Sequence, residues 1–116
     1  MTTEDRASAL AVHIESRPPH GHGISNALWI ILRGDADRTN LQQLQTALCG
    51  IELGDQGDVH LQLAELTFCD IEAFRRLATF AQNTMDKGHP VFAHGASSVI
   101  RKMITLLDIQ DTLKLP

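Results

Sequence analysis

Histidines could bind metal or transfer protons in this protein, but their spacing in the sequence does not match a known site. His20 and His22, separated by one glycine, could hold a metal ion between two imidazoles. No third ligand at metal-binding spacing accompanies them, and isolated histidine pairs in polar loops are usually solvated. His60 and His94 could shuttle protons, but the sequence places no carboxylate beside either residue. We therefore predict that both are surface or helix-capping histidines.

The two cysteines, Cys49 and Cys69, are predicted to be reduced, small residues of the core. They are too few for a disulfide scaffold and do not form a CxxC pair. Cys69 precedes an expected helix start, where the helix dipole would lower the pKa of its thiol. The adjacent Asp70 opposes this effect, because a neighbouring carboxylate disfavours a thiolate. A reactive cysteine is not expected.

Established motifs for catalysis and phosphate binding do not occur in the sequence. It has no GxSxG, HExxH, Walker or GxGxxG pattern, and no spacing pairs a nucleophile with a base. We expect a protein that is not an enzyme, uses no cofactor and binds no metal.

Composition argues against nucleic-acid and membrane partners. The net charge is -4, with one tryptophan and no tyrosine, so the chain lacks the basic surface and the aromatic rings that nucleic acids require. The longest strictly apolar run, 27–32, is far shorter than the roughly 20 residues of a membrane-spanning helix. The acidic N-terminus does not resemble a secretory signal. We expect no membrane insertion and a cytoplasmic location.

The first two secondary-structure elements predicted from the sequence are strands. Residues 8–15 alternate in polarity and residues 27–32 are continuously apolar, which is typical of a half-buried and a fully buried strand. The segment 17–23 between them is rich in proline and glycine and is too short for a crossover helix. The two strands should therefore pair antiparallel.

Helices and strands then alternate along the chain. A helix is predicted from Asn40 to Gly50, and a longer one begins at Asp70 and ends at Lys87-Gly88. Strands are predicted at 59–63 and 90–93, and a third helix begins at Ser97 or Ser98 and leads to a hydrophobic tail after residue 108. The 116 residues suffice for one domain, here 8–116 after a flexible N-terminus at 1–7. The order β-β-α-β-α-β-α predicts an α/β fold with a mixed, mostly parallel sheet of four or five strands, on which the helices pack.

Two strand-to-helix loops are the most informative segments. Residues 34–37 and 67–70 each follow a strand and precede a helix, so both should emerge at one edge of the sheet, where ligands and partners usually bind. Asp70 and Asn40 are also suited to capping their helices, each worth about 1 kcal/mol. The basic pair Arg75-Arg76 could engage an acidic partner, although solvated helix faces carry such pairs routinely.

These segments, in their order and spacing, resemble the STAS domain family. The resemblance is carried by Gly34-Asp35-Ala36-Asp37-Arg38-Thr39-Asn40, by 62–70, and by the helix that ends at 87–90, and it covers about residues 9–115. The family includes anti-sigma factor antagonists and the cytoplasmic domains of sulfate transporters. The resemblance implies a single STAS-like domain that regulates transcription in bacteria by binding a protein.

The resemblance also implies that a phosphorylation switch is missing. In the family, the aspartate matching Asp70 is followed by a serine or threonine, which the partner kinase, itself the anti-sigma factor, phosphorylates. The equivalent residue here is Ile71, which cannot accept a phosphate. Glu72 places a fixed negative charge in the same helical turn. That charge either imitates a permanently modified state or simply stabilises the helix start.

We therefore expect a non-catalytic regulator resembling an anti-sigma factor antagonist, whose partner is a serine-kinase-like anti-sigma factor. One alternative is an accessory subunit on the ATPase of an ABC transporter. Another is a sensor that holds a nucleotide or metabolite around Asp37, Thr39 and Asp70. The expected docking surface comprises the 34–40 and 68–76 loops and the exposed face of the second helix. Its predicted partner-binding residues are Asp35, Asp37, Thr39, Asp70, Ile71, Glu72, Arg75 and Arg76.

Overall fold

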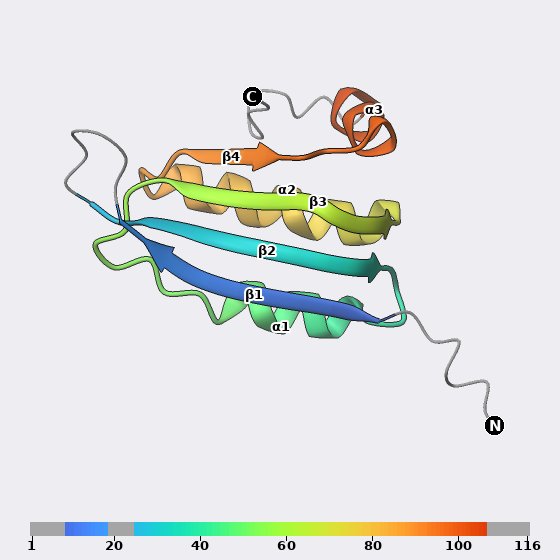
Figure 1. Ribbon diagram of the computed structural model, residues 1–116, viewed down its shortest axis with the longest axis horizontal. Coiled ribbons are helices and arrows are strands. Elements are labelled where there is room, and N and C mark those ends of the chain that lie inside the picture. Colours follow the sequence, from blue (N-terminus) through green and yellow to red (C-terminus); the bar gives the residue numbers. More distant parts are fainter. Residues whose placement is uncertain (1–8, 19–24, 107–116) are drawn as a thin grey trace.

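A four-stranded sheet forms the centre of the protein in the computed structural model, which describes residues 9–18 and 25–106 (Figure 1). The strand order is β1-β2-β3-β4, with β1 antiparallel to β2 and the other two pairings parallel. The predicted mixed, mostly parallel sheet and its antiparallel first pair are confirmed. The strands are β1 (Leu10–Arg17), β2 (Ala27–Ala36), β3 (Val59–Cys69) and β4 (Val91–His94).

Three helices complete the predicted element order: α1 (Leu41–Cys49), α2 (Ile71–Asp86) and α3 (Ser98–Leu106). Figure 1 shows α1 and α2 on the same side of the sheet, behind the strands, so the opposite side carries no helix over β1 and β2. α3 follows β4, and its Ile100 and Ile104 belong to the same buried cluster as the sheet and α2. The core is therefore one layer between the sheet and the helices.

Alternation of apolar and polar residues along β3 explains why the helices cover one side of this strand. Val59, Leu61 and Leu63 are buried, whereas His60 and Gln62 between them stay half-exposed on the other side. A period of two assigns alternate residues to opposite faces of a sheet, so the apolar set faces the helices.

Both central strands run further than the sequence predicted. β2 continues to Ala36 and β3 to Cys69, and their register shifts twice, between Ile31 and Arg33 and between Gly34 and Asp35. Such irregularities insert an extra residue and break the alternation of polarity. The sequence signal for β3 therefore fades after Leu63 although the pairing with β2 continues.

The cysteines divide between surface and core. Cys69 is buried, as predicted, and burial together with the nearby Asp70 raises the pKa of its thiol to about 12. Cys49 is exposed, so the prediction that it belongs to the core is wrong. It is the last residue of α1, one position past the buried Leu48, and it therefore points away from the sheet.

Several predictions fall outside the described residues: the flexible N-terminus at 1–7, the His20 and His22 pair, and the hydrophobic tail after residue 108. Within the described part of the chain, no helix combines the length and the apolar character needed to span a membrane.

Gly34→Ala should lower the free energy of unfolding by more than about 2 kcal/mol, because Gly34 has a φ of +94° and a Cβ would overlap the carbonyl oxygen of Ala9. That oxygen accepts a hydrogen bond from the Asp35 N–H at 2.9 Å, which leaves it little room to move. Urea unfolding measures the effect. The matched control is Gly54→Ala, with a φ of +51° but open space around the Cβ, which should cost only about 1 kcal/mol. Equal losses in the two variants would contradict the steric argument.

Candidate functional site

The two predicted loops do emerge side by side at one edge of the sheet. Ala36 and Cys69, the last residues of β2 and β3, are register partners, and the Asp70 N–H donates to the Ala36 carbonyl at 3.0 Å. α1 and α2 begin directly beyond this edge (Figure 1). The segments 35–40 and 68–76 together are called the strand-end surface below.

The Asp70 carboxylate joins the two loops. Its Oδ1 accepts from the Ala73 N–H at 2.8 Å and caps α2, as predicted. Its Oδ2 accepts from the Arg38 N–H at 3.1 Å, across the gap to the loop before α1. Because both oxygens are engaged in fixing the backbone, the predicted binding residue Asp70 has a structural role in the strand-end surface.

Asn40 occupies the N-cap position of α1, as predicted, but its side chain makes no capping hydrogen bond and instead holds the preceding loop. Its Nδ2 donates to the Asp35 carbonyl at 2.8 Å, and its Oδ1 accepts from the Asp37 N–H at 3.0 Å. No side-chain hydrogen bond caps α1. The side chain is buried and points back into the loop, where it satisfies backbone groups that a helix cap would leave unpaired.

The acidic residues of this loop are also engaged locally. Asp37 Oδ1 accepts from both the backbone N–H, at 2.8 Å, and the hydroxyl of Thr39. The Asp35 carboxylate accepts from the Thr67 hydroxyl, which also donates to the Gly34 carbonyl at 3.0 Å. These contacts fix the predicted site residues Asp35, Asp37 and Thr39 in a single arrangement.

Two large apolar side chains stand exposed beside this polar frame. Phe68 is 53% exposed and Ile71 is 46% exposed. Ile71, one of the predicted partner-binding residues, is the first residue of α2. Phe68 lies in the predicted docking segment 68–76 but was not named as a partner-binding residue, since the alternation that would have placed it outward is broken by the register shifts before it.

The charged residues of α2 complete the strand-end surface. Glu72 and Arg75 are both exposed and form an ion pair at 3.3 Å. Arg76 is exposed and makes no ion pair with any other residue in the described ranges. The surface thus offers an apolar centre with carboxylates and guanidinium groups around it.

A second cluster, on the side of the sheet away from α1 and α2, was not expected from the sequence. Trp29, His60 and Phe92 are register partners on three neighbouring strands, and their rings form one row. Trp29 and His60 stack with centroids 4.5 Å apart, and His60 and Phe92 with centroids 5.3 Å apart. His94 also stacks on Trp29 and on His60, and the Arg17 guanidinium lies 4.3 Å from the Trp29 ring centroid. We call these five residues the ring row.

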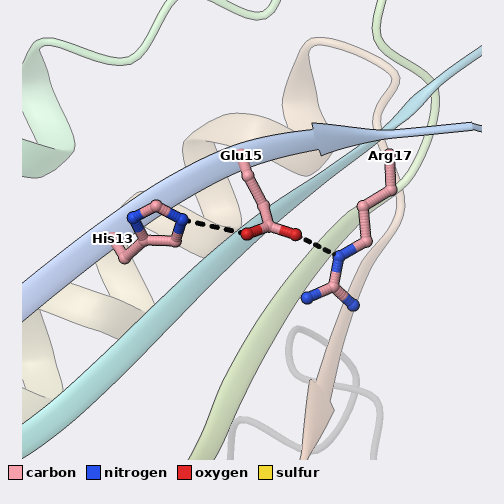
Figure 2. Close-up of polar contacts among 3 residues, drawn as sticks. All are labelled: His13, Glu15 and Arg17. Atoms are coloured by element: carbon pink, nitrogen blue, oxygen red, sulfur yellow. Dashed lines mark hydrogen bonds and ion pairs between the residues drawn. The ribbon is translucent and has the colours of Figure 1, made fainter.

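Charged residues of β1 extend the ring row to the edge of the sheet. Figure 2 shows Glu15 between His13 and Arg17, with its carboxylate accepting from both. The three alternate along β1 and therefore share a face. The hydrogen bond from Arg17, followed by that from His13, lowers the pKa of the Glu15 carboxyl.

The histidines of the ring row are not the isolated surface or capping residues that the sequence suggested. His60 Nδ1 and His94 Nε2 are 2.8 Å apart, so one ring donates to the other and at least one of the two is neutral. Burial lowers the pKa of His94. The detectable signal was the alternation of His60, Phe92 and His94 with buried residues, but the register that joins them across strands is not visible in a sequence. No three histidine, cysteine, aspartate or glutamate residues of the described segments gather as metal ligands.

Solved structures share this fold at low sequence identity. An anti-sigma factor antagonist from Mycobacterium paratuberculosis matches with a TM-score of 0.72 at 14% identity, over 92% of this chain and 85% of that one. The Bacillus cell fate determinant SpoIIAA in its phosphorylated form matches with a TM-score of 0.65 at 14% identity, over 91% of each chain. The STAS domain of a SulP transporter from Vibrio cholerae matches with a TM-score of 0.56 at 18% identity, over 78% of this chain and 72% of that one.

These likenesses establish the architecture. No family model and no curated protein matches the sequence. The fold that the sequence resemblance implied, that of the STAS domains and SpoIIAA, is confirmed.

Protein stability should fall as the pH drops from about 7 to about 5, because burial lowers the pKa of folded His94 below its ordinary value of 6.5. In that window the unfolded chain binds the proton more readily, so the stability present above pH 6.5 is lost as the solution is acidified. His60 contacts His94 directly, and Asp58 lies 4.0 Å from His60 Nε2. Urea unfolding at a series of pH values measures the slope. His94→Gln should flatten it, and an unchanged slope would contradict the assignment to His94.

Proposed function

We propose that this chain is a non-catalytic regulator that binds a serine-kinase-like anti-sigma factor through the strand-end surface, in the manner of an anti-sigma factor antagonist. The observation that carries the proposal is the exposure of Phe68 and Ile71 on this surface, in a fold shared with anti-sigma factor antagonists. Protein interfaces commonly bury an aromatic or aliphatic centre within a polar rim. The charged side chains of Glu72, Arg75 and Arg76 would supply such a rim. In this role the chain would act in the cytoplasm.

The loops of the strand-end surface are held in place by hydrogen bonds, which supports binding by a preformed surface rather than by loops that fold on binding. Asp70 fixes the backbone on both sides of the gap, and Asn40 fixes the first loop from within. A partner would therefore not have to order these loops, and association would lose less conformational entropy.

The regulator would work without a phosphorylation switch of its own. Ile71, the residue after the Asp70 cap, has no hydroxyl group. The nearby hydroxyls of Thr39 and Thr67 both donate to carboxylates of the loop. Glu72 gives the first turn of α2 a permanent negative charge. Control would then come from the amount of the protein, from a second partner, or from competition with a phosphorylatable relative.

One further candidate is an accessory role on a transporter, and the STAS domain of a SulP transporter shares this fold. In that case the same surface would dock on a transporter ATPase of the ABC class. The nucleotide-sensor alternative gains no support, because the carboxylates of Asp37 and Asp70 are already committed to hydrogen bonds within the loops.

Phe68→Ser and Ile71→Lys should each weaken binding to the anti-sigma kinase at least tenfold, or about 1.4 kcal/mol, because each removes an apolar group from the centre of the surface. Isothermal titration calorimetry with the purified kinases of the native cell measures the dissociation constant. Val99→Lys is the matched control, since Val99 is 60% exposed but lies on α3. If none of the kinases binds and a transporter ATPase does, the transporter role replaces the proposed one. Unchanged binding by both surface variants would remove this surface from either role.

Incubation with the partner kinase and radiolabelled ATP should leave the wild-type chain unlabelled. Ile71→Ser should create an acceptor at the helix N-terminus, where the dipole and free amides favour a phosphate, and should be labelled by the same kinase. Phosphate counting and peptide mapping measure both outcomes. Stoichiometric labelling of the wild-type chain would show that a switch exists after all.

A further inference from the structure

A groove runs between α1 and α2 on the helical side of the protein. Its first part is a cavity of about 300 Å³, with Leu48, Ile51 and Phe80 among its apolar lining residues and Arg76 and Lys87 among its polar ones. Pockets for small ligands begin at about this volume and combine an apolar lining with a few polar groups.

The groove continues toward the strand-end surface. A second hollow of about 350 Å³ shares Gln45 and Arg76 with the first and adds Arg38 and Leu41. Arg76 therefore lies where the two hollows meet, and Arg38 lies on the far side of the second. Two guanidinium groups thus face the same space from the start of α1 and from α2.

The charge of this groove is uncompensated. Arg38, Arg76 and Lys87 line it, and no aspartate or glutamate lines either hollow. In the described part of the chain, none of these three side chains forms an ion pair with a carboxylate. This is unusual in a chain with a net charge of -4, whose surface carries more carboxylates than cations. A guanidinium group that is not already paired can bind a carboxylate through two parallel hydrogen bonds.

We propose that this groove binds a small amphipathic carboxylate, with its charged group between Arg38 and Arg76 and its apolar body over Leu48, Ile51 and Phe80. The ligand class follows from the lining: the apolar cavity accepts a hydrocarbon chain or ring, and the arginines require an anion. The inference goes beyond the protein-binding role, because the cavity involves neither Phe68 nor Ile71. Arg38 and Arg76 belong both to this groove and to the strand-end surface.

Cys49 gives this site a built-in reporter. It is exposed and lines the first cavity, so a bound ligand would shield its thiol from reagents. The other cysteine, Cys69, is buried, and its thiol has a pKa raised to about 12, so it should not compete for the reagent in the folded protein.

The test is the rate at which N-ethylmaleimide alkylates Cys49 in the full chain, with decanoate as the probe at concentrations below those that form micelles. Decanoate should slow the reaction at least fivefold at saturation. Decanol, which has the same chain but no charge, should need at least ten times the concentration for half protection. Arg76→Gln should raise the half-protecting concentration of decanoate about tenfold, whereas Lys102→Gln, a cation removed from α3, should leave it unchanged.

Three results would overturn the proposal: no protection by decanoate, equal protection by decanol and decanoate, or full protection in Arg76→Gln. Protection that appears without ligand and grows with protein concentration would show that a second copy covers the groove, and would also overturn it. Thermal unfolding of each variant verifies that it is folded before alkylation is compared. Binding of the kinase to the strand-end surface is measured separately, so either proposal can fail while the other stands.

Discussion

The carboxylate of Asp70 is the contact on which the arrangement of the strand-end surface depends. Its two oxygens accept from the N–H groups of Ala73, in the first turn of α2, and of Arg38, in the loop before α1. Parallel pairing brings the ends of β2 and β3 together, but pairing alone does not set the path of the loops beyond them. The Asp70 side chain caps α2 and holds the neighbouring loop, and it therefore fixes the positions of the two loops that form the strand-end surface. A role for Asp70 in partner contact and its role in the fold are difficult to separate.

The two sides of the sheet are stabilised by different means. On the helical side, burial of apolar residues from β2, β3 and β4 against α1 and α2 supplies the core. On the other side, the ring row joins the strands laterally through stacked rings, a cation over Trp29 and the hydrogen bond between His60 and His94. Stacked aromatic pairs across strands stabilise a sheet directly. Because its hydrogen bond requires a neutral imidazole, the ring row is sensitive to pH.

Features that follow from a periodic or local sequence pattern could be predicted from the sequence. Features that depend on strand register or on a single tertiary contact could not. Alternation in β3 and the capping aspartate of α2 are local signals, so the element order, the sheet type and the meeting of the two loops followed from them. The extended end of β3 and the exposure of Phe68 follow from register shifts that leave no periodic trace. Asn40 illustrates the remaining difficulty: its residue type suits a cap, but its amide is used by the loop that precedes the helix. The ring row and the groove arise between elements far apart in the chain, which periodicity cannot pair.

Ile71 places an exposed apolar group at the first position of α2. The first position of α2 points away from the sheet, where either a hydroxyl or an alkyl group meets solvent without disturbing the core. A hydroxyl there would allow a charge to be added and removed, whereas isoleucine fixes the position as apolar. Exposing an aliphatic group to water opposes the general tendency to bury it, and contact with a partner would recover that cost. The exposure of Ile71 therefore supports the proposal that this surface is covered when the protein acts.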